Sequence, residues 1–268
     1  KNCLSKKSCI SILSMSNFNC DSFEQIEKNL DRLFVPKYYP GFILSIYENG
    51  NESFFLNKGY DDISKKIEYK KDSIFRIYSM TKPIVSTAAM QLIENKKLAL
   101  DDDVTKYIPE WDDAVFYKSN NKNVITIKDL FTHTSGLTYA FQGQSEVDKK
   151  YKVSGINSIV DSELSSQEII NELSNIPLEF SPGSFYNYSI SIDILGFIIE
   201  RISNKTLNEY LYENIFNILG MKDTAFTLDA SKIERLAMCY RWDENKNKYE
   251  AHDLKTNPNI EVKSYLKK

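Results

Sequence analysis

A serine and a lysine three positions apart are the side chains of this sequence best suited to chemistry. Ser79 and Lys82 stand where a strand-like segment runs into a strongly helical one. Residues three apart on a helix lie on the same face, one turn from each other. A serine hydroxyl is a weak nucleophile until a base takes its proton, and a lysine in an apolar or cationic setting can act as that base. The pair therefore predicts a nucleophile with its general base.

The same spacing occurs twice more, so its place in the chain matters. Ser119 lies with Lys122 in an asparagine-rich loop, and Ser264 lies near the end of the chain. Only the Ser79 copy precedes a helical pattern, which makes it the candidate nucleophile among the three. The alternative for Ser79 is an ordinary helix N-cap beside a solvated lysine.

Two further segments contain groups that could take part in proton transfer. Residues 181–189 combine a Pro-Gly turn with aromatic side chains. A tyrosine close to cations loses its proton more readily and can pass it on, although the segment also suits a plain turn with core aromatics. His133 follows a short helical pattern, but the chain has no G-x-S-x-G elbow. We therefore expect His133 to hydrogen-bond a loop rather than to serve in a Ser-His-Asp triad.

The composition is that of a globular protein of one or two domains. The 268 residues are 42% hydrophobic and carry a formal net charge of -3. This balance supplies a core and predicts no nucleic-acid partner. No apolar stretch reaches the roughly 18 residues that span a membrane. The four cysteines and two histidines lack the spacing of a metal site, so we expect neither a metal nor another cofactor.

The order of the periodic segments indicates an α+β fold. Asn49-Gly50 suits the tight turn of a hairpin, helical patterns follow, and strand-like patterns return near the end. We expect a sheet built from both ends of the chain, with an all-helical lobe between them. The expected elements are strands over 42–47, 53–60, 74–77 and 236–242, and helices over 22–34, 81–95, 126–131, 166–173, 188–202 and 206–219.

The expected domain organisation follows from where these patterns begin and end. Lysine and serine without acidic residues at the start indicate a disordered leader or a partial targeting segment. Residues 139–165 appear as a polar excursion within the helical lobe. The expected parts are the leader over 1–21, a folded domain over 22–250 with sheet regions at 22–80 and 226–250 and a helical lobe at 81–225, and an irregular tail over 251–268.

Five blocks of the sequence keep the order of a known family. They are Phe75–Ile84, Leu98–Trp111, Leu130–Leu137, Pro182–Gly196 and Leu219–Thr224. Together they resemble the penicillin-recognising serine hydrolases, most closely the class C β-lactamase-related group with its esterases, D-aminopeptidases and transpeptidase-like relatives. The resemblance implies a β-lactamase/transpeptidase-like domain, an α/β sandwich beside an all-helical lobe.

The resemblance also implies roles for single residues. Ser79 is the acylated nucleophile, Lys82 its partner base and Tyr188 the tyrosine of the second motif. Tyr188 is chosen by its distance from Pro182-Gly183, and Tyr186 is the alternative. The backbone N–H of Ser79 would supply half of an oxyanion hole.

Two departures from the family pattern shape the expected activity. The second motif ends in Ile190, where β-lactamases and penicillin-binding relatives have an amide, and this favours a carboxylesterase. The third motif, of the Lys-Thr-Gly or His-x-Gly type, has one near match at Lys255-Thr256-Asn257. That match lacks the glycine and is taken as coincidence. We therefore expect a truncated domain without its C-terminal strands and helix.

The sequence thus predicts a serine hydrolase that forms an acyl-enzyme on Ser79 and cleaves a small ester or amide, with a carboxylesterase favoured. One alternative is an inactive relative that serves as a binding or scaffold module. Another is a β-lactamase or D-amino-acid peptidase. The cytosol is the default location, and a mitochondrion or another organelle is the alternative.

Overall fold

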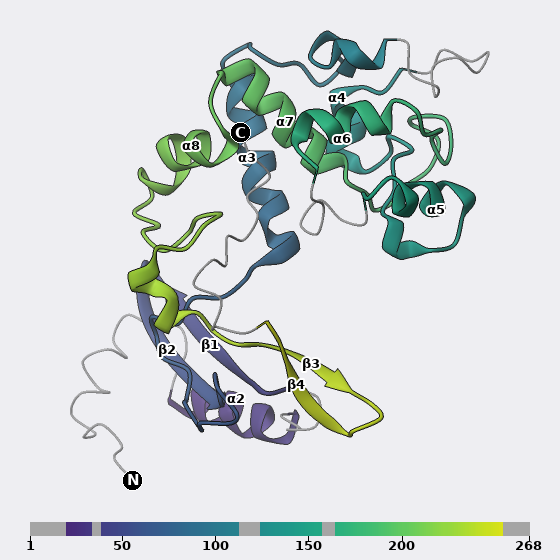
Figure 1. The fold of residues 1–268 in the computed structure, drawn as a ribbon. Helices are drawn as coiled ribbons and strands as arrows, with labels where there is room; N and C mark the ends of the chain where they lie inside the picture. The colour runs from purple at the N-terminus through teal and green to yellow at the C-terminus, as the bar shows by residue number, and fades with distance from the viewer. Residues whose placement is uncertain (1–19, 34–38, 113–123, 157–163, 254–268) are drawn as a thin grey trace. The chain divides into compact units, whose positions relative to one another are not determined.

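The structure, a computed structural model, describes residues 20–33, 39–112, 124–156 and 164–253 (Figure 1). The chain divides into two compact units. The first joins the residues up to Arg76 with Asp229–Pro258, and the described residues of the second lie within Ile77–Leu228. Within the described residues, no helix is long and apolar enough to cross a membrane.

The first unit begins with a helix and a β-hairpin. These elements are α2 (Cys20–Leu33), β1 (Gly41–Glu48) and β2 (Asn51–Gly59). The predicted Asn49-Gly50 turn is confirmed, with φ angles of 50° and 77°, the left-handed backbone that a tight hairpin needs. Phe23 of α2 stacks on Phe54 of β2, with ring centroids 5.0 Å apart, so the helix packs on the hairpin.

The C-terminal part of the first unit is a second hairpin. Its elements are a 3-10 helix (Ala230–Arg235), β3 (Cys239–Asp243) and β4 (Lys248–Asp253). Among the described strands, each pairs only with its neighbour in sequence, so there are two separate two-stranded sheets. The expected sheet built from both ends, with a strand over 74–77, is reduced to one parallel bridge between Ile74 and Leu236.

Hydrogen bonds around that bridge join the two ends of the chain. Ile74 donates its N–H to the carbonyl of Arg235 and accepts the N–H of Ala237, both at 2.7 Å. The carboxylate of Asp61 accepts the N–H of Met238 at 2.8 Å. Both segments therefore belong to one unit, although Asp61 and Met238 are 177 positions apart in the sequence.

The expected irregular tail over 251–268 is wrong at its start. Residues 251–253 complete strand β4, because Cys239 pairs with Asp253 and extends the ladder. The rest of that tail, including Lys255-Thr256-Asn257, lies outside the described residues, as do residues 1–19 of the expected leader.

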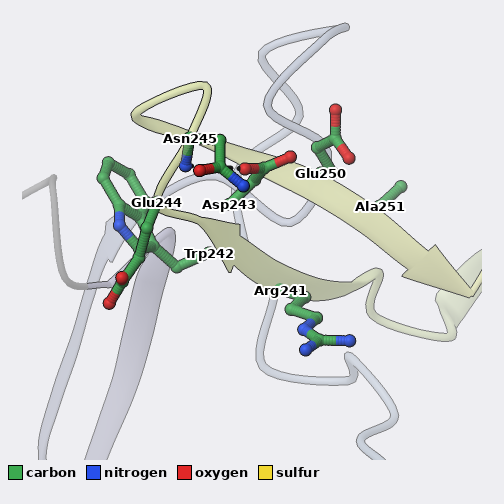
Figure 2. A pocket seen from close by; sticks show the side chains of 7 residues that line it. All are labelled: Arg241, Trp242, Asp243, Glu244, Asn245, Glu250 and Ala251. Carbon is green, nitrogen blue, oxygen red and sulfur yellow. Dashed lines mark hydrogen bonds between the residues drawn. The ribbon is translucent and has the colours of Figure 1, made fainter.

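An open hollow lies at the β3–β4 hairpin (Figure 2). Its lining is mostly polar, and Asp243 accepts the N–H groups of Asn245 and Lys246 there, which closes the turn. The lining residues are Arg241, Trp242, Asp243, Glu244, Asn245, Glu250 and Ala251. None of them is a residue for which the sequence predicts chemistry.

The helices and turns of the second unit are its only regular elements in the described part, apart from one β-bridge between Asp103 and Thr126. Its longest helix, α3, matches the segment predicted after Ser79. The elements are α3 (Thr81–Glu94), α4 (Ile127–Thr132), α5 (Glu146–Val153), α6 (Ser166–Leu173), α7 (Ser191–Ser203) and α8 (Leu207–Leu211), with a π-helical turn (Tyr212–Phe216) and 3-10 turns at Tyr78–Met80, Val104–Lys106, Pro109–Trp111 and Ala140–Gln142.

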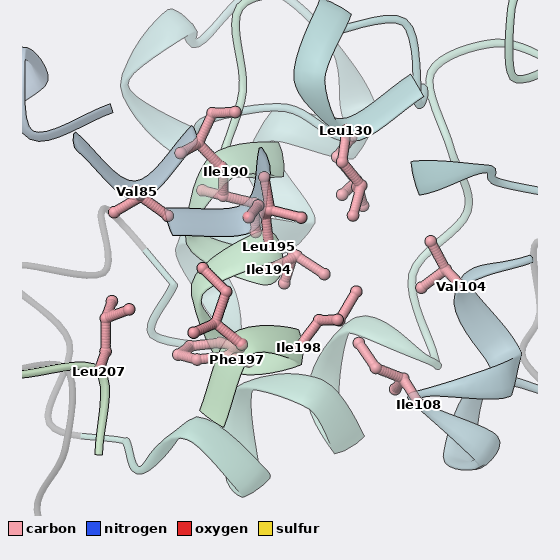
Figure 3. Packing of buried hydrophobic residues seen from close by; sticks show 14 of the residues in the cluster. Val85, Val104, Ile108, Leu130, Ile190, Ile194, Leu195, Phe197, Ile198 and Leu207 are labelled. Atoms are coloured by element: carbon pink, nitrogen blue, oxygen red, sulfur yellow. The ribbon is translucent and has the colours of Figure 1, made fainter. Parts of the chain in front are cut away.

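The core of this unit forms around α7, which is apolar on nearly all sides (Figure 3). Ile194, Leu195 and Ile198 are fully buried. Gly196 allows the neighbouring helices to come close, because a Cβ there would lie 3.0 Å from Leu207 of α8 and 4.0 Å from Val85 of α3. Helix α7 is thus the central element against which α3 and α8 pack.

Capping boxes start four of these helices. In each, a serine or threonine accepts an N–H three residues on, and an acidic side chain there accepts the N–H of the cap. The pairs are Thr126–Asp129, Ser145–Asp148, Ser165–Glu168 and Thr206–Glu209. The second of them starts α5, so the interpretation of 139–165 as a polar excursion misses a helix that its polar cap residues set up.

Helix α7 starts later than predicted. The sequence predicts a helix over 188–202, but Ile190 is the N-cap residue and the helix begins at Ser191. Tyr188 and Ser189 have no helical assignment, because their polar and backbone groups bond a neighbouring loop instead. Tyr188 therefore lies just before the N-cap residue of α7 and outside the helix.

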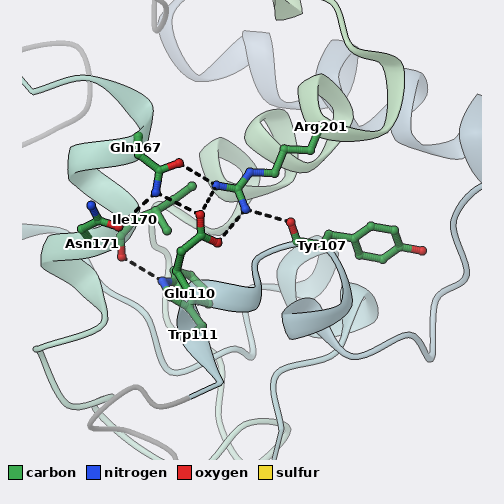
Figure 4. A network of polar contacts seen from close by, with 7 residues as sticks. All are labelled: Tyr107, Glu110, Trp111, Gln167, Ile170, Asn171 and Arg201. Carbon is green, nitrogen blue, oxygen red and sulfur yellow. Dashed lines mark hydrogen bonds and ion pairs between the residues drawn. The ribbon is translucent and has the colours of Figure 1, made fainter.

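A charged network joins three helical segments of this unit (Figure 4). Arg201 donates to both carboxylate oxygens of Glu110 at 2.8 Å and to the carbonyl of Tyr107 at 2.9 Å. It also bonds Gln167 of α6 at 2.9 Å. Hydrogen bonding to Arg201 lowers the pKa of Glu110 to about 2, against an opposing effect of burial.

Glu110→Gln should destabilise the protein by about 1–2 kcal/mol at pH 7, since a bidentate, partly buried ion pair is lost. The folded-state pKa lies below the ordinary value of 4.5, so this stabilisation is complete above about pH 4.5 and is lost as the pH falls towards 2. Urea unfolding of the unmutated protein and of Glu110→Gln, at pH 7 and at pH 3, measures the difference in their free energies of unfolding. Glu146→Gln, which breaks a more exposed pair with Lys149, is the control and should change the free energy of unfolding much less than Glu110→Gln does. Equal losses for both variants, or a gap that does not narrow at pH 3, would contradict the assignment.

Candidate active site

Ser79 lies in the 3-10 turn that leads into α3. The N-cap residue of α3 is Met80 and it makes no side-chain cap bond, so the alternative of Ser79 as an N-cap is wrong. Tyr78, just before it, has a φ of 41°. A non-glycine residue in this left-handed region carries roughly 1 kcal/mol or more of strain and is typical of functional sites. The sequence gives no sign of this, because tyrosine does not favour such a backbone.

Lys82 lies one turn along, as its spacing predicts. Its Nζ is 3.4 Å from the Oγ of Ser79. The ammonium also lies over two aromatic rings, 4.7 Å from the centroid of Tyr188 and 5.5 Å from that of Tyr139. Ring faces are electron-rich and attract a cation, so the two rings help to hold the Lys82 ammonium beside Ser79.

Tyr188 lies next to Ser79 although the two residues are far apart in the sequence. Its hydroxyl donates to the Oγ of Ser79 at 2.6 Å across 109 residues of chain. Burial raises the pKa of this phenol, but hydrogen bonding to Lys82 and Ser79 and the charge of Lys82 outweigh it, so the pKa of Tyr188 is lowered. A phenol with a lowered pKa at hydrogen-bond distance from a serine can exchange a proton with it.

The alternative tyrosine, Tyr186, occupies a different position. It is 69% exposed, and its ring packs against His133 with centroids 6.0 Å apart. The structure therefore brings Ser79, Lys82 and Tyr188 together, all within the unit Ile77–Leu228.

A loop after α4 holds the main chain around Tyr188. The N–H of Asn187 donates to the carbonyl of His133 at 2.8 Å. Gln142 donates to the carbonyl of Tyr188 at 2.6 Å, and Asn187 donates from its side chain to the carbonyl of Leu137 at 3.0 Å. Two backbone carbonyls and one side-chain amide of residues 133–142 thus fix the main chain from which the phenol projects.

His133 acts within this loop. It ends α4 with a left-handed backbone, φ 56°, and its Nδ1 accepts the N–H of Ser189 at 3.2 Å. An accepting Nδ1 leaves the ring proton on Nε2. Burial, and then the charge of Lys82, lower the pKa of His133 to about 4. The expectation that His133 hydrogen-bonds a loop is confirmed.

Three buried serine hydroxyls continue from His133 into the core. Ser189 and Ser191 lie 2.7 Å apart, as do Ser191 and Ser135. Ser135 accepts the N–H of Leu137 at 3.2 Å. Buried hydroxyls need such partners, and here they link the loop after α4 to the start of α7.

Tyr139 is a site residue that sequence reasoning missed. It is nearly buried, lies against Lys82, and donates its hydroxyl to the carboxylate of Asp193 at 3.2 Å. Its ring centroid is 5.5 Å from that of Tyr188. The chain has 17 tyrosines, and one in a loop without periodicity carries no local signal.

The two departures from the family pattern have different outcomes. Ile190, which replaces the amide of the second motif, is fully buried in the hydrophobic core (Figure 3). An amide buried there without partners would be unfavourable, so this position belongs to the core and not to the reacting groups. The sequence near the third motif, Lys255-Thr256-Asn257, lies outside the described residues.

Comparisons with known proteins identify the family. The model of the family described as Beta-lactamase matches residues 30–259. The chain belongs to the beta-lactamase family. Esterase EstB of Burkholderia gladioli is 31% identical over 81% of this chain, and an uncharacterized protein of Mycobacterium tuberculosis is 35% identical over 77%. The chain spans about half the length of these relatives, 54% and 52%.

Solved structures of the family share the fold, which is β-lactamase/transpeptidase-like with mixed helix and strand. The structure of EstCE1, a hydrolase with promiscuous acyltransferase activity, has a TM-score of 0.73 and 25% identity, covering 91% of this chain and 60% of that one. A class C beta lactamase at 18% identity has a TM-score of 0.64, covering 93% of this chain and 60% of that one. The predicted α+β fold of this family is confirmed.

His133 should remain neutral down to about pH 4, because its folded-state pKa lies below the ordinary 6.5. The stability that it contributes should be complete above about pH 6.5 and lost as the pH falls towards 4. Imidazole ¹⁵N NMR over pH 3–8 measures the titration, and His133→Asn assigns the signal, since Asn tolerates the left-handed backbone. A His133 midpoint near 6.5 would contradict the buried, accepting Nδ1.

Proposed function

We propose that the protein is a serine hydrolase that forms an acyl-enzyme on Ser79, and that its substrates are small carboxylic esters. The observation that carries this is the meeting of a hydroxyl, an ammonium and a phenol at Ser79, Lys82 and Tyr188. These groups come from two segments far apart in the chain. Similarity to an esterase supports the reaction class.

In the proposed acylation, Tyr188 first releases its own proton to bulk water, and the Oγ of Ser79 then attacks the ester carbonyl carbon while its proton passes to the Tyr188 phenolate. Tyr188 is the nearer acceptor, and the charge of Lys82 stabilises its phenolate. The proton then moves from Tyr188 to the leaving alkoxide as the C–O bond breaks. Lys82 is thus assigned to hold charge beside the phenol rather than to be the immediate base. The N–H of Ser79 is the proposed donor to the oxyanion.

Water completes the proposed cycle by the same transfers in reverse. Tyr188 takes a proton from water, hydroxide attacks the acyl carbon, and the proton returns to the Oγ of Ser79 as the acid leaves. A phenol and an ammonium that face the same hydroxyl suit both halves, because neither half needs a further proton carrier.

An ester is favoured over a β-lactam or a peptide by the residues near the reacting groups. The position of the second-motif amide is Ile190, in the core. The described neighbours of Tyr188 and Lys82 include aromatic rings such as Tyr139 and the neutral His133. A β-lactamase or D-amino-acid peptidase, or an inactive binding module, would be revealed by the two experiments below.

A fluorophosphonate probe should label the full-length protein at Ser79 and fail to label Ser79→Ala. Tyr188→Phe should slow labelling by roughly 10²-fold or more, because the proton acceptor is removed. Tyr186→Phe should slow it far less, and the reverse order would transfer the role to Tyr186. Peptide mass spectrometry locates the adduct. No adduct on Ser79 of the folded, full-length protein would support the inactive binding module instead.

The full-length protein should hydrolyse p-nitrophenyl butyrate far faster than a chromogenic cephalosporin, measured as kcat/KM for each. Ser79→Ala is the control in both assays, because surface lysines hydrolyse activated esters slowly. Rapid cephalosporin turnover without ester turnover would replace the esterase by a β-lactamase. Release of a C-terminal D-amino acid from a peptide, with neither of the other activities, would indicate the peptidase.

A further inference from the structure

Exposed aromatic side chains gather in the segments that hold the reacting groups. Five aromatic residues in the described part of the helical unit are strongly exposed, and four of them lie within three residues of Ser79, Tyr139 or Tyr188. These four are Tyr78, Phe141, Phe185 and Tyr186, and the fifth is Tyr212, beyond α8. Single exposed apolar side chains are normal on a protein surface, whereas a group of them beside a candidate active site marks a binding surface.

Two of these rings are held by buried partners that touch Tyr188. Phe141, 66% exposed, stacks on Tyr139, which is only 6% exposed, at 4.8 Å and an interplanar angle of 21°. Tyr186, 69% exposed, packs edge-on against His133, which is 9% exposed. In each pair the buried ring fixes the place of the exposed one.

The two inner rings place these pairs beside the reacting groups. Tyr139 and His133 lie 5.5 Å and 5.0 Å from the ring of Tyr188. Tyr139 also lies 5.5 Å from the ammonium of Lys82. We call Phe141 and Tyr186, with these supporting rings, the aromatic rim.

The backbone under the rim is fixed as well. Phe141 belongs to the 3-10 turn Ala140–Gln142, and Gln142 bonds both the carbonyl of Tyr188 and the side chain of Asn187. Asn187 follows Tyr186 directly and bonds His133. Both exposed rings therefore stand on segments that are bonded to each other and to Tyr188.

We propose that the aromatic rim binds a phenyl-sized ring of the substrate, so that the preferred substrates are esters with an aryl group near the scissile bond. This rests on the proposed ester hydrolysis at Ser79 and adds the substrate class. Aromatic rings prefer offset or edge contacts with other rings over equal apolar area, by roughly three- to tenfold in affinity. Exposed faces of Phe141 and Tyr186 offer such contacts to a ring bound to the ester.

The test compares two ester pairs that differ only in aromaticity. Benzyl butyrate and cyclohexylmethyl butyrate carry the ring on the alcohol, and ethyl 3-phenylpropionate and ethyl 3-cyclohexylpropionate carry it on the acid. Binding to full-length Ser79→Ala by ligand-detected NMR gives dissociation constants without turnover. We expect the aryl member of at least one pair to bind roughly three- to tenfold more tightly. The pair that responds shows whether the rim binds the alcohol or the acid.

Variants then locate the preference on the rim. Phe141→Leu and Tyr186→Leu keep apolar bulk and lose the ring, so each should reduce the preference and the double variant should abolish it. Tyr212→Leu removes another exposed ring of the unit, 56% exposed and away from Ser79, Tyr139 and Tyr188 in the sequence, and is the matched control. No aryl preference, or one that survives the double variant, would overturn the proposal.

The outcomes separate this inference from the proposed function. Aryl preference in the Ser79→Ala background, without fluorophosphonate labelling of Ser79 in the unmutated protein, would retain the rim and reject the hydrolase. Labelling of Ser79 without aryl preference would retain the hydrolase and reject the rim.

Discussion

The hydrogen bond between Tyr188 and Ser79 depends on how closely α3 and α7 can pack. Ser79 stands at the start of α3 and Tyr188 just before α7, so the 2.6 Å between their oxygens reports the relative position of two helices. Gly196 leaves room for Val85 of α3 at the crossing. An added Cβ there would be tight against Leu207 of α8, at 3.0 Å, but in ordinary contact with Val85, at 4.0 Å, so alanine would first strain the α7–α8 contact and only a bulkier side chain would push α3 away from α7.

The polar groups around Tyr188 lie where a loop ends and helix α7 begins inside the hydrophobic core. His133 and the buried serines Ser135, Ser189 and Ser191 satisfy one another. Their bonds place the main chain of Tyr188 while the apolar face of α7 excludes water. Structure and chemistry are thus coupled here, because the groups that complete the core also orient the phenol.

Local features of the sequence predicted part of the site and the resemblance supplied the rest. Ser79 and Lys82 are three residues apart on one helical turn, so the sequence spacing alone predicts that their side chains are neighbours. Tyr188 can be identified only from the resemblance to the family, because nothing in the neighbouring sequence distinguishes it from Tyr186. Tyr139 was missed, since its contacts with Lys82 and Asp193 depend on tertiary packing. Long-range contacts between loop residues have no periodicity from which to infer them.

The fold shows the same division. Helix α6 over 166–173 was predicted at its observed bounds, because Ser165 and Glu168 form its cap within four residues. The sheet expected from both ends of the chain was predicted wrongly. The two hairpins are set by local turns, but pairing between Ile74 and Leu236 is a long-range contact that no local pattern indicates. Hydrogen bonds to the carbonyls of Tyr188 and His133 hold the main chain on both sides of the contact between residues 133–142 and 187–188. Because Gln142 and His133 secure the main chain, the outward rings of Phe141 and Tyr186 can be exchanged without moving the phenol, so in the proposed hydrolase substrate preference is free to evolve separately from the proposed reaction.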